Sequence, residues 1–408
     1  PFFFVTGPNV DLARDAGLPL PRDAKMTDVP CHSWILPTLL HHAGVDFLHL
    51  GCNAASTSPE VPPLFWWEGP DGSRLLTMYT AESYGTGLVP PKNWPHKTWL
   101  ALIHTGDNHG PPTPDEVKQL LAEAKRNLPG VKVRIGRLSD FADAFLAEKP
   151  ALPVVRGDMP DTWIHGPMSD PAGAKIARNT RPLIASSEAL HTLLGAWDVR
   201  APGATRAIVK AGERSLQRPR RRAQPDSAAD LIAQAYEQSL LYGEHTWGGA
   251  LYWVTKYGRG AKWGYGDMWL ADHKAGRFQR LEDSWAEHTA YIQAARGLVT
   301  PLLSHDLKAL AQAVKVRGKR IVVFNPLPWR RDGLVTVPFD KPGVVALRAA
   351  DAHDVVLVDA RGQQLSFMAR NIPPMGYRTF IPVTAKGVSG RSAGFQPAVS
   401  RVSNPQTA

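Results

Sequence analysis

Two aspartates and one histidine occupy positions where their side chains could do chemistry. Asp28 lies between a strand-like stretch and an apolar helix predicted over 34–43, which places it at the carboxyl edge of a sheet, where α/β folds bind ligands. Its alternative role is to cap that helix. Asp107 lies in the loop GDNHGPP, whose alternative role is turn formation. His245 follows a predicted helix and is either a metal ligand or a structural histidine.

The elements that must position these residues change along the chain. Alternating strands and helices predict an α/β layer over residues 1–150. Helical periodicity predicts a three-helix bundle within 151–314, and short β-branched runs predict the start of a β-sandwich over 315–385. The Ser/Gly/Pro-rich tail, 386–408, is predicted to be disordered. The α/β strands are expected at 2–5, 45–50, 75–79 and 131–135, and the helices at 34–43, 114–128, 140–148 (capped by Ser139), 175–197, 228–242 and 281–303.

Charge and cysteine content exclude several classes of protein. The net charge is +10, but residues 205–222 hold seven basic residues and one acidic residue, so this one stretch supplies +6 of it. We interpret that stretch as a solvated loop, and we expect no nucleic-acid partner because basic and aromatic residues are interleaved nowhere else. Cys31 and Cys52 form no disulfide framework and have no zinc-type spacing. No apolar run approaches the roughly 20 residues needed to span a membrane.

Several stretches of the chain resemble, in the right order, glycoside hydrolase family 38, the α-mannosidases. The stretch 27–44 (TDVPCHSWILPTLLHHAG) is similar to the family pattern Asp-Pro-Phe-Gly-His-Ser and its following helix. The stretch 65–79 (FWWEGPDGSRLLTMY) matches a family run almost letter for letter, and its Asp71-Gly72 pair also predicts a hairpin turn. The resemblance covers most of residues 20–385 and continues through 106–117, 131–145, 156–190, 242–253, 322–335 and 371–380.

The family resemblance implies a fold and a role for each candidate. The fold would be a partial seven-stranded α/β barrel of the glycoside hydrolase/deacetylase type, followed by the helical bundle and the β-sandwich. Asp28 would be the nucleophile and a Zn²⁺ ligand, His245 a second zinc ligand, and Asp107 a residue that binds sugar hydroxyls. The substrate would be a carbohydrate with an α-mannosidic bond, cleaved with retention from the chain end.

The resemblance also places the acid/base carboxylate, with a choice of two residues. The family carboxylate falls five residues before a glycine, and Asp161 stands five before Gly166. Asp158, in the Gly-Asp pair itself, is the alternative. Retention needs the two carboxylates roughly 5 Å apart, so Asp161 is expected to face Asp28. The run Met168 to Pro171 departs from the family's Thr-Ser-Arg-Pro and leaves the exact sugar open.

The zinc ligands are incomplete in this sequence. Family members carry a His-x-Asp pair near the start of the catalytic domain, whereas none of the fourteen histidines here has Asp two residues later. We therefore expect sequence upstream of Pro1, and we expect this fragment alone to be inactive. We also expect ligand atoms of Asp28 and His245 to lie within roughly 3 to 5 Å of each other, because zinc–ligand bonds are about 2.0 to 2.2 Å.

Two other functions stay open at this point. An inactive sugar-binding relative would keep the fold without the full zinc site. A polysaccharide-deacetylase-like metal hydrolase would use Asp and His ligands on a similar barrel, although a β-domain after a helical bundle argues against it.

Overall fold

The computed structural model describes residues 12–29, 31–103, 109–160, 170–199, 227–245, 266–340, 343–353 and 355–384. The predicted strand at 2–5, Asp107, Asp161, the basic stretch 205–222 and the tail from 386 lie outside these ranges. The chain divides into two compact units. Unit 1 is Pro1–Arg178 with Tyr236–Gln293, and unit 2 is Asn179–Ala235 with Ala294–Ala408.

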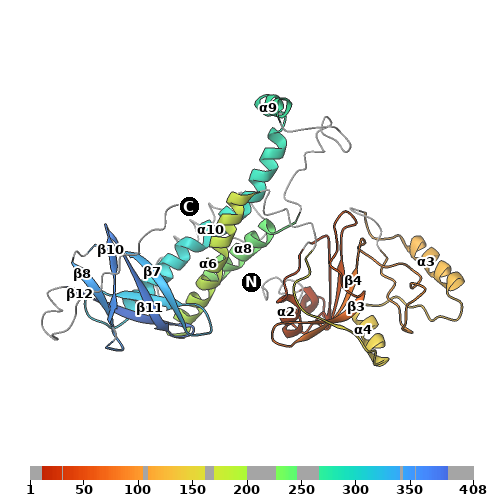
Figure 1. The fold of residues 1–408 in the computed structure, drawn as a ribbon, viewed down its shortest axis with the longest axis horizontal. Coiled ribbons are helices and arrows are strands. Elements are labelled where there is room, and N and C mark those ends of the chain that lie inside the picture. Colours follow the sequence, from red (N-terminus) through yellow and green to blue (C-terminus); the bar gives the residue numbers. More distant parts are fainter. Residues whose placement is uncertain are drawn as a thin grey trace, which may run out of the picture. The chain divides into compact units, whose positions relative to one another are not determined.

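Unit 1 contains a five-stranded mixed sheet in the order β1-β2-β4-β3-β5. Figure 1 labels β3 and β4 of this sheet. Neighbours β1, β2 and β4 are parallel, β3 is antiparallel to β4, and β5 is parallel to β3. Because β1, β2 and β4 run in the same direction, their carboxyl ends meet at one edge of the sheet. The strands are β1 (Asp23–Thr27), β2 (Phe47–Gly51), β3 (Leu64–Glu68), β4 (Arg74–Thr80) and β5 (Val154–Val155).

Strands β3 and β4 form the predicted hairpin. Gly72, at φ 84°, adopts the backbone conformation that favours glycine, and Gly69 N–H donates to Ser73 O at 2.9 Å. Asp71 also anchors the turn to helix α2 (Leu36–His42), because its carboxylate accepts a 2.6 Å bond from Thr38 Oγ1. This bond, followed by those from His42 and Ser73, holds the pKa of Asp71 well below its usual range.

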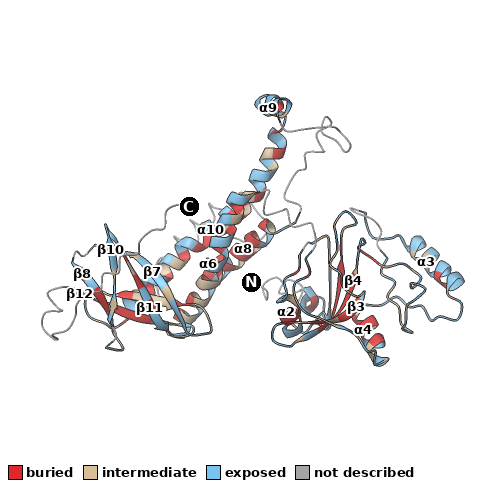
Figure 2. Cartoon of the chain, in the orientation of Figure 1, coloured by how far each residue is buried: buried red, intermediate tan, exposed pale blue. Residues whose placement is uncertain are grey.

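Both faces of the sheet are covered, which explains why β2 is buried at every position. On one face, Leu48, Leu50 and Phe65 pack with Leu40 of α2. On the other, Phe47, Leu76 and Met78 pack against Phe141 and Phe145 of α4 (Leu138–Ala147). Figure 2 shows this contrast between buried strands and the exposed helix α3 (Pro114–Asn127).

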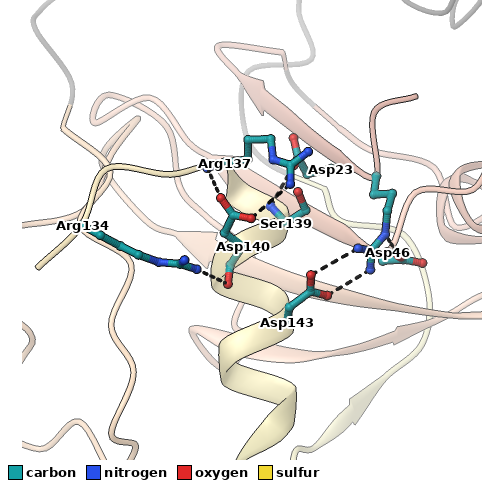
Figure 3. A network of polar contacts seen from close by, with 8 residues as sticks. Asp23, Asp46, Arg134, Arg137, Ser139, Asp140 and Asp143 are labelled. Atoms are coloured by element: carbon teal, nitrogen blue, oxygen red, sulfur yellow. Dashed lines mark hydrogen bonds and ion pairs between the residues drawn. The ribbon is translucent and has the colours of Figure 1, made fainter. Parts of the chain in front are cut away.

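A polar network at the amino ends of the strands fixes α4 to the sheet (Figure 3). Arg22, just before β1, donates to Asp46 at 2.7 Å and to Asp143 of α4 at 3.0 Å. Asp23 accepts the Ser139 backbone N–H at 2.8 Å. The N-cap of α4 is Arg137 and not Ser139. Asp140 accepts the Arg137 N–H at 2.9 Å, and the helix begins two residues earlier than predicted.

The predicted strand at 131–135 is wrong. Residues 131–137 follow α3 without regular structure, and Val131, Val133 and Ile135 are exposed at 56%, 43% and 74%. The β-branched pattern predicts a strand, but strand formation depends on a neighbour that pairs with it. The preceding helix is as predicted, with Thr113 and Glu116 forming a capping box.

The three long helices are α6 (Pro171–Ala196), α8 (Ala228–Tyr242) and α10 (Gln279–Ala313), and the boundary between the units passes through each. Helix α8 has the predicted bounds, whereas α6 begins four residues earlier and α10 ends ten residues later than predicted. In unit 1, Thr289 Oγ1 donates to Asp170 at 2.6 Å, and the His288 ring contacts Tyr242 O at 3.0 Å. In unit 2, buried Asp306 contacts the His191 ring at 3.0 Å. A short helix, α9 (Asp267–Lys274), precedes α10.

The rest of unit 2 consists of two antiparallel sheets, β10-β11-β7 and β6-β12-β8-β9. Phe367 of one sheet and Phe380 of the other belong to one core with ring centroids 5.0 Å apart. Strands β10 and β11 were missed by the sequence prediction. The strands are β6 (Ile321–Asn325), β7 (Arg331–Pro338), β8 (Val344–Ala349), β9 (Val355–Leu357), β10 (Asp359–Arg361), β11 (Gln364–Ile372) and β12 (Gly376–Thr384).

The architecture agrees with the predicted class at a coarse level: a sheet with parallel strands, then long helices, then antiparallel sheets. The described strands of unit 1 form an open sheet, so a barrel is not shown. Within the described ranges, no helix has the length and apolar character to cross a membrane.

Candidate active site

Three polar side chains gather at the carboxyl edge of the parallel strands. Asp28 follows β1, Asn53 follows β2 and Tyr84 follows β4. Because β1, β2 and β4 are adjacent and parallel, their following loops meet at one edge, which is where α/β sheets place ligands.

The Asp28 carboxylate is held on both oxygens. Tyr84 donates its hydroxyl to Oδ1 in a short bond, and Asn53 Nδ2 lies 3.3 Å from the same oxygen. Asn53 Nδ2 also donates to the Tyr84 hydroxyl at 2.6 Å. Oδ2 contacts Nε2 of His245 at 3.0 Å. The four residues therefore form one polar cluster around a partly exposed carboxylate.

His245 reaches Asp28 from 217 residues further along the chain, at the end of α8. Its other ring nitrogen, Nδ1, pairs with Glu244 Oε1 at 2.6 Å. The imidazole thus lies between two carboxylates.

The backbone around Asp28 is unusual and does not cap α2. Asp28 has φ 62° and Cys31 φ 58°, in a region that few residues other than glycine adopt. The N-cap of α2 is Ile35, with no side-chain capping bond, so the helix-capping alternative for Asp28 is wrong. Backbone strain of this kind is concentrated at functional sites.

Asp158, the alternative acid/base residue, accepts a hydrogen bond from a residue outside the cluster around Asp28. Its Oδ1 accepts the Trp34 backbone N–H at 2.7 Å, and His32 and Met159 form an isolated β-bridge beside it. These bonds tie the segment after Asp28 to the segment after β5. Asp161 and Asp107 lie outside the described residues, so their expected approach to Asp28 stays a prediction.

Gly51, the last residue of β2, makes the cluster possible. A Cβ built there would lie 2.7 Å from Ser83 O, 2.8 Å from Thr27 Cγ2 and 2.9 Å from Tyr84 Cα. All three distances are shorter than real Cβ contacts, and two involve backbone atoms that cannot swing away. Only glycine lets the Tyr84 loop approach β1 and β2 closely enough for the Asp28 bond.

The pair Asp28–His245 fits two positions of a zinc site. Two ligand atoms that each bind zinc at about 2.0 to 2.2 Å can lie 3 to 4 Å apart, and Oδ2 and Nε2 are 3.0 Å apart. The described residues contain no group of three His, Cys, Asp or Glu side chains able to hold a metal. The described set is therefore incomplete for zinc.

Sequence reasoning missed Asn53 and Tyr84. A signal was present for both, because each follows a strand that the sequence predicts, at 45–50 and 75–79. Taking polar residues after every predicted parallel strand as candidates would have found them together with Asp28.

Comparisons with known proteins give a distant structural likeness. No family model matches the chain, and no curated protein gives a significant match. Among solved structures, an alpha-mannosidase from Enterococcus faecalis is similar, with a TM-score of 0.44 and 14% sequence identity. The likeness covers 95% of this chain and 45% of that chain, so the present chain spans less than half of that protein's length.

Proposed function

We propose that this chain carries part of the active site of a retaining exo-glycosidase that cleaves α-mannosidic bonds, with Asp28 as the nucleophile. The observation that carries the proposal is the 3.0 Å contact between Asp28 and His245, which come from segments far apart in sequence. Packing alone does not require them to meet. They meet at the carboxyl edge of the sheet, and each is the residue to which the family resemblance assigns zinc binding.

The cluster suits a carboxylate nucleophile. Asp28 would attack the anomeric carbon and form a covalent glycosyl-enzyme, which water then hydrolyses. Tyr84 and Asn53 would hold Oδ1 and fix the orientation of the carboxylate before attack. The second carboxylate, for which we propose Asp161, would protonate the leaving oxygen and later accept the proton of the attacking water.

We also propose that Asp28 and His245 are two ligands of a Zn²⁺ ion whose other ligands lie outside the described residues. When bound, zinc would act as a Lewis acid toward the sugar. Metal analysis tests this separately: His245→Ala should lower the bound zinc. Equal zinc in that variant and the parent would contradict the assignment.

The nucleophile is tested by covalent trapping. Trapping and the activity measurements below use the protein that carries this chain together with all of its zinc ligands. It is incubated with a 2-deoxy-2-fluoro α-mannosyl fluoride, whose glycosyl-enzyme hydrolyses slowly, and the labelled peptide is identified by mass spectrometry. We expect the label on Asp28, with Asp28→Asn unlabelled. Asp143→Asn is the matched control, because Asp143 pairs with Arg22 at the amino ends of the strands and not with the cluster. A label on another residue would overturn the assignment, as would labelling of Asp28→Asn at the parent level.

Activity measurements extend the test to the reaction. Methyl α-mannoside should be hydrolysed with retention of the anomeric configuration, as observed by proton NMR of the first-formed sugar. An inverted product would contradict the proposal. Release of acetate from an acetylated saccharide, without glycosidic cleavage, would favour the deacetylase alternative.

A further inference from the structure

A cleft of about 950 Å³ opens beside the candidate active site in unit 1. It is lined by parts of 59–63 and of the long segment 78–103. Ser83 and Gly85 both line it, and Tyr84, which binds Asp28, stands between them. Its volume falls within the range of about 300–1,000 Å³ that holds small ligands. The cleft therefore flanks the loop that brings Tyr84 to Asp28.

The residues that line the cleft have an unusual composition for a site that binds a polar substrate. Among the described residues that line the cleft, none is charged and none has an amide or imidazole side chain. Its polar side chains are the hydroxyls of Tyr79, Thr80, Ser83 and Thr86, and most of the remainder are proline, aliphatic and tryptophan residues. An uncharged lining selects against ionic ligands, because a buried charge without a partner is costly.

Several of those polar groups are already bonded within the protein. Thr86 Oγ1 donates to Leu100 O and accepts the Leu102 N–H at 2.7 Å. Ser83 Oγ accepts the Gly85 N–H at 3.3 Å. Thr80 Oγ1 contacts the ring of buried His49 at 3.0 Å. A ligand in the cleft would find mainly apolar surface.

Trp94 and Trp99 supply a fixed aromatic wall. Trp94 Nε1 donates to Thr98 O at 2.8 Å, and Trp99 Nε1 donates to Gly87 O at 2.9 Å. The two rings meet edge to face, with 4.8 Å between their centroids. Both pack against the core that contains Phe141 and Phe145 of α4. Because both indole N–H groups are bonded to the backbone, the rings offer a ligand their apolar surfaces.

We propose that this cleft binds the leaving group of the glycoside substrate, and that this group is an apolar alcohol or phenol. The assignment rests on the proposed function, which places the cleaved sugar at Asp28 and hence the rest of the substrate next to it. A second sugar would require free hydrogen-bonding side chains to replace its lost water contacts. An aromatic or aliphatic group gains from the lining without that requirement.

The test compares two substrates with the same sugar. The ratio of kcat/KM for the 4-methylumbelliferyl α-mannoside over methyl α-mannoside is measured in the protein used for trapping and in its variants Ala81→Trp and Val89→Lys. Ala81→Trp fills the cleft, and Val89→Lys adds a charge to its lining at a position that is 45% exposed and should tolerate it. We expect each variant to lower the ratio roughly ten-fold or more. Ala122→Trp, on exposed α3, is the matched control and should keep the parent ratio.

A binding measurement separates this proposal from the glycosidase proposal. Saturation-transfer NMR with 4-methylumbelliferone alone should show binding that weakens in Ala81→Trp and Val89→Lys and persists in Ala122→Trp. Such binding without hydrolysis of any mannoside would support the apolar cleft and overturn the glycosidase. An unchanged ratio in both cleft variants would overturn the cleft assignment. Preference for α-mannobiose over the umbelliferyl glycoside would also overturn it.

Discussion

The geometry at Asp28 depends on a small number of polar atoms. Tyr84 bonds to both Asp28 and Asn53, so its hydroxyl is the centre of the cluster that fixes Oδ1. Its side chain is almost fully buried, at 9% exposure. The orientation of the carboxylate therefore rests on the Tyr84 hydroxyl as much as on His245.

Tyr84→Phe should lower kcat while leaving KM nearly unchanged, because it removes the bond that orients Asp28 and leaves the ring in place. A hydrogen bond to a charged group contributes about 1.5–3 kcal/mol, so we expect a loss of roughly ten- to hundred-fold in kcat. Steady-state kinetics on methyl α-mannoside provide the measurement. Tyr377→Phe in unit 2 is the control. A change confined to KM would show that Tyr84 contacts the sugar instead of positioning Asp28.

His49 lies beneath this edge, fully buried in the middle of β2 beside Lys25 of β1. Burial, and then the charge of Lys25, lowers the pKa of His49 to about 4. The folded protein therefore keeps His49 neutral at pH values where the unfolded chain, with a pKa near 6.5, is protonated.

Stability should consequently fall as the pH drops from about 6.5 to 4, since the unfolded state binds the extra proton. This difference in the pKa of His49 between the folded and unfolded states corresponds to on the order of 3 kcal/mol of stability. His49→Gln can keep the contact with Thr80 without titrating, so its free energy of unfolding should lose less over that range. Urea unfolding at pH 7 and pH 4.5 measures the difference. Parallel losses in parent and variant would show that His49 is not the group responsible.

At the scale of elements, the close approach of β2 and the loop that carries Tyr84 determines the geometry around Asp28. Gly51 allows this approach, and β2 itself is buried on both faces. A side chain at this position must move either β1 or the loop, and both carry residues of the cluster.

Gly51→Ala should disrupt the cluster more than it disrupts the fold. We expect a loss of stability of about 1–3 kcal/mol from overpacking, and a larger relative loss of Asp28 labelling by the fluoro-sugar. Gly44→Ala is a useful comparison, because Gly44 has open space around it and strains only its own backbone at φ 82°. Normal trapping in Gly51→Ala would show that the loop can shift without displacing Tyr84.

The sequence predicts the elements that have strong local patterns. Helix α8 begins and ends where its periodicity does, and the Asp71-Gly72 turn is placed correctly. The segment 131–135 shows the limit, because β-branched residues cannot reveal whether a pairing strand exists. Asp28 and His245 were found by resemblance, whereas Asn53 and Tyr84 depend on strand order, which local patterns do not encode.

The molecule as a whole has separate cores in its two units. The sheet of unit 1 is packed by α2 and α4, while the antiparallel strands of unit 2 share the core around Phe367 and Phe380. The candidate site and the apolar cleft both belong to unit 1.

Phe380→Ala should therefore destabilise unit 2 by about 3–5 kcal/mol, because Phe380 is fully buried against Phe367. Hydrogen exchange should show reduced protection in β6, β8 and β12 and little change in β1, β2 and β4. An equal loss of protection in β2 and β12 would mean that the two units unfold as one.

The exposed segment 131–135 has a consequence for how this protein behaves at high concentration. In an extended chain, Val131, Val133 and Ile135 would lie on one side and Lys132 and Arg134 on the other. Such a β-prone, unpaired stretch is a template on which a second molecule can add a strand. The two cations oppose this self-association by mutual repulsion. High salt weakens that repulsion, so the colloidal stability of the protein should be lowest in concentrated salt solutions.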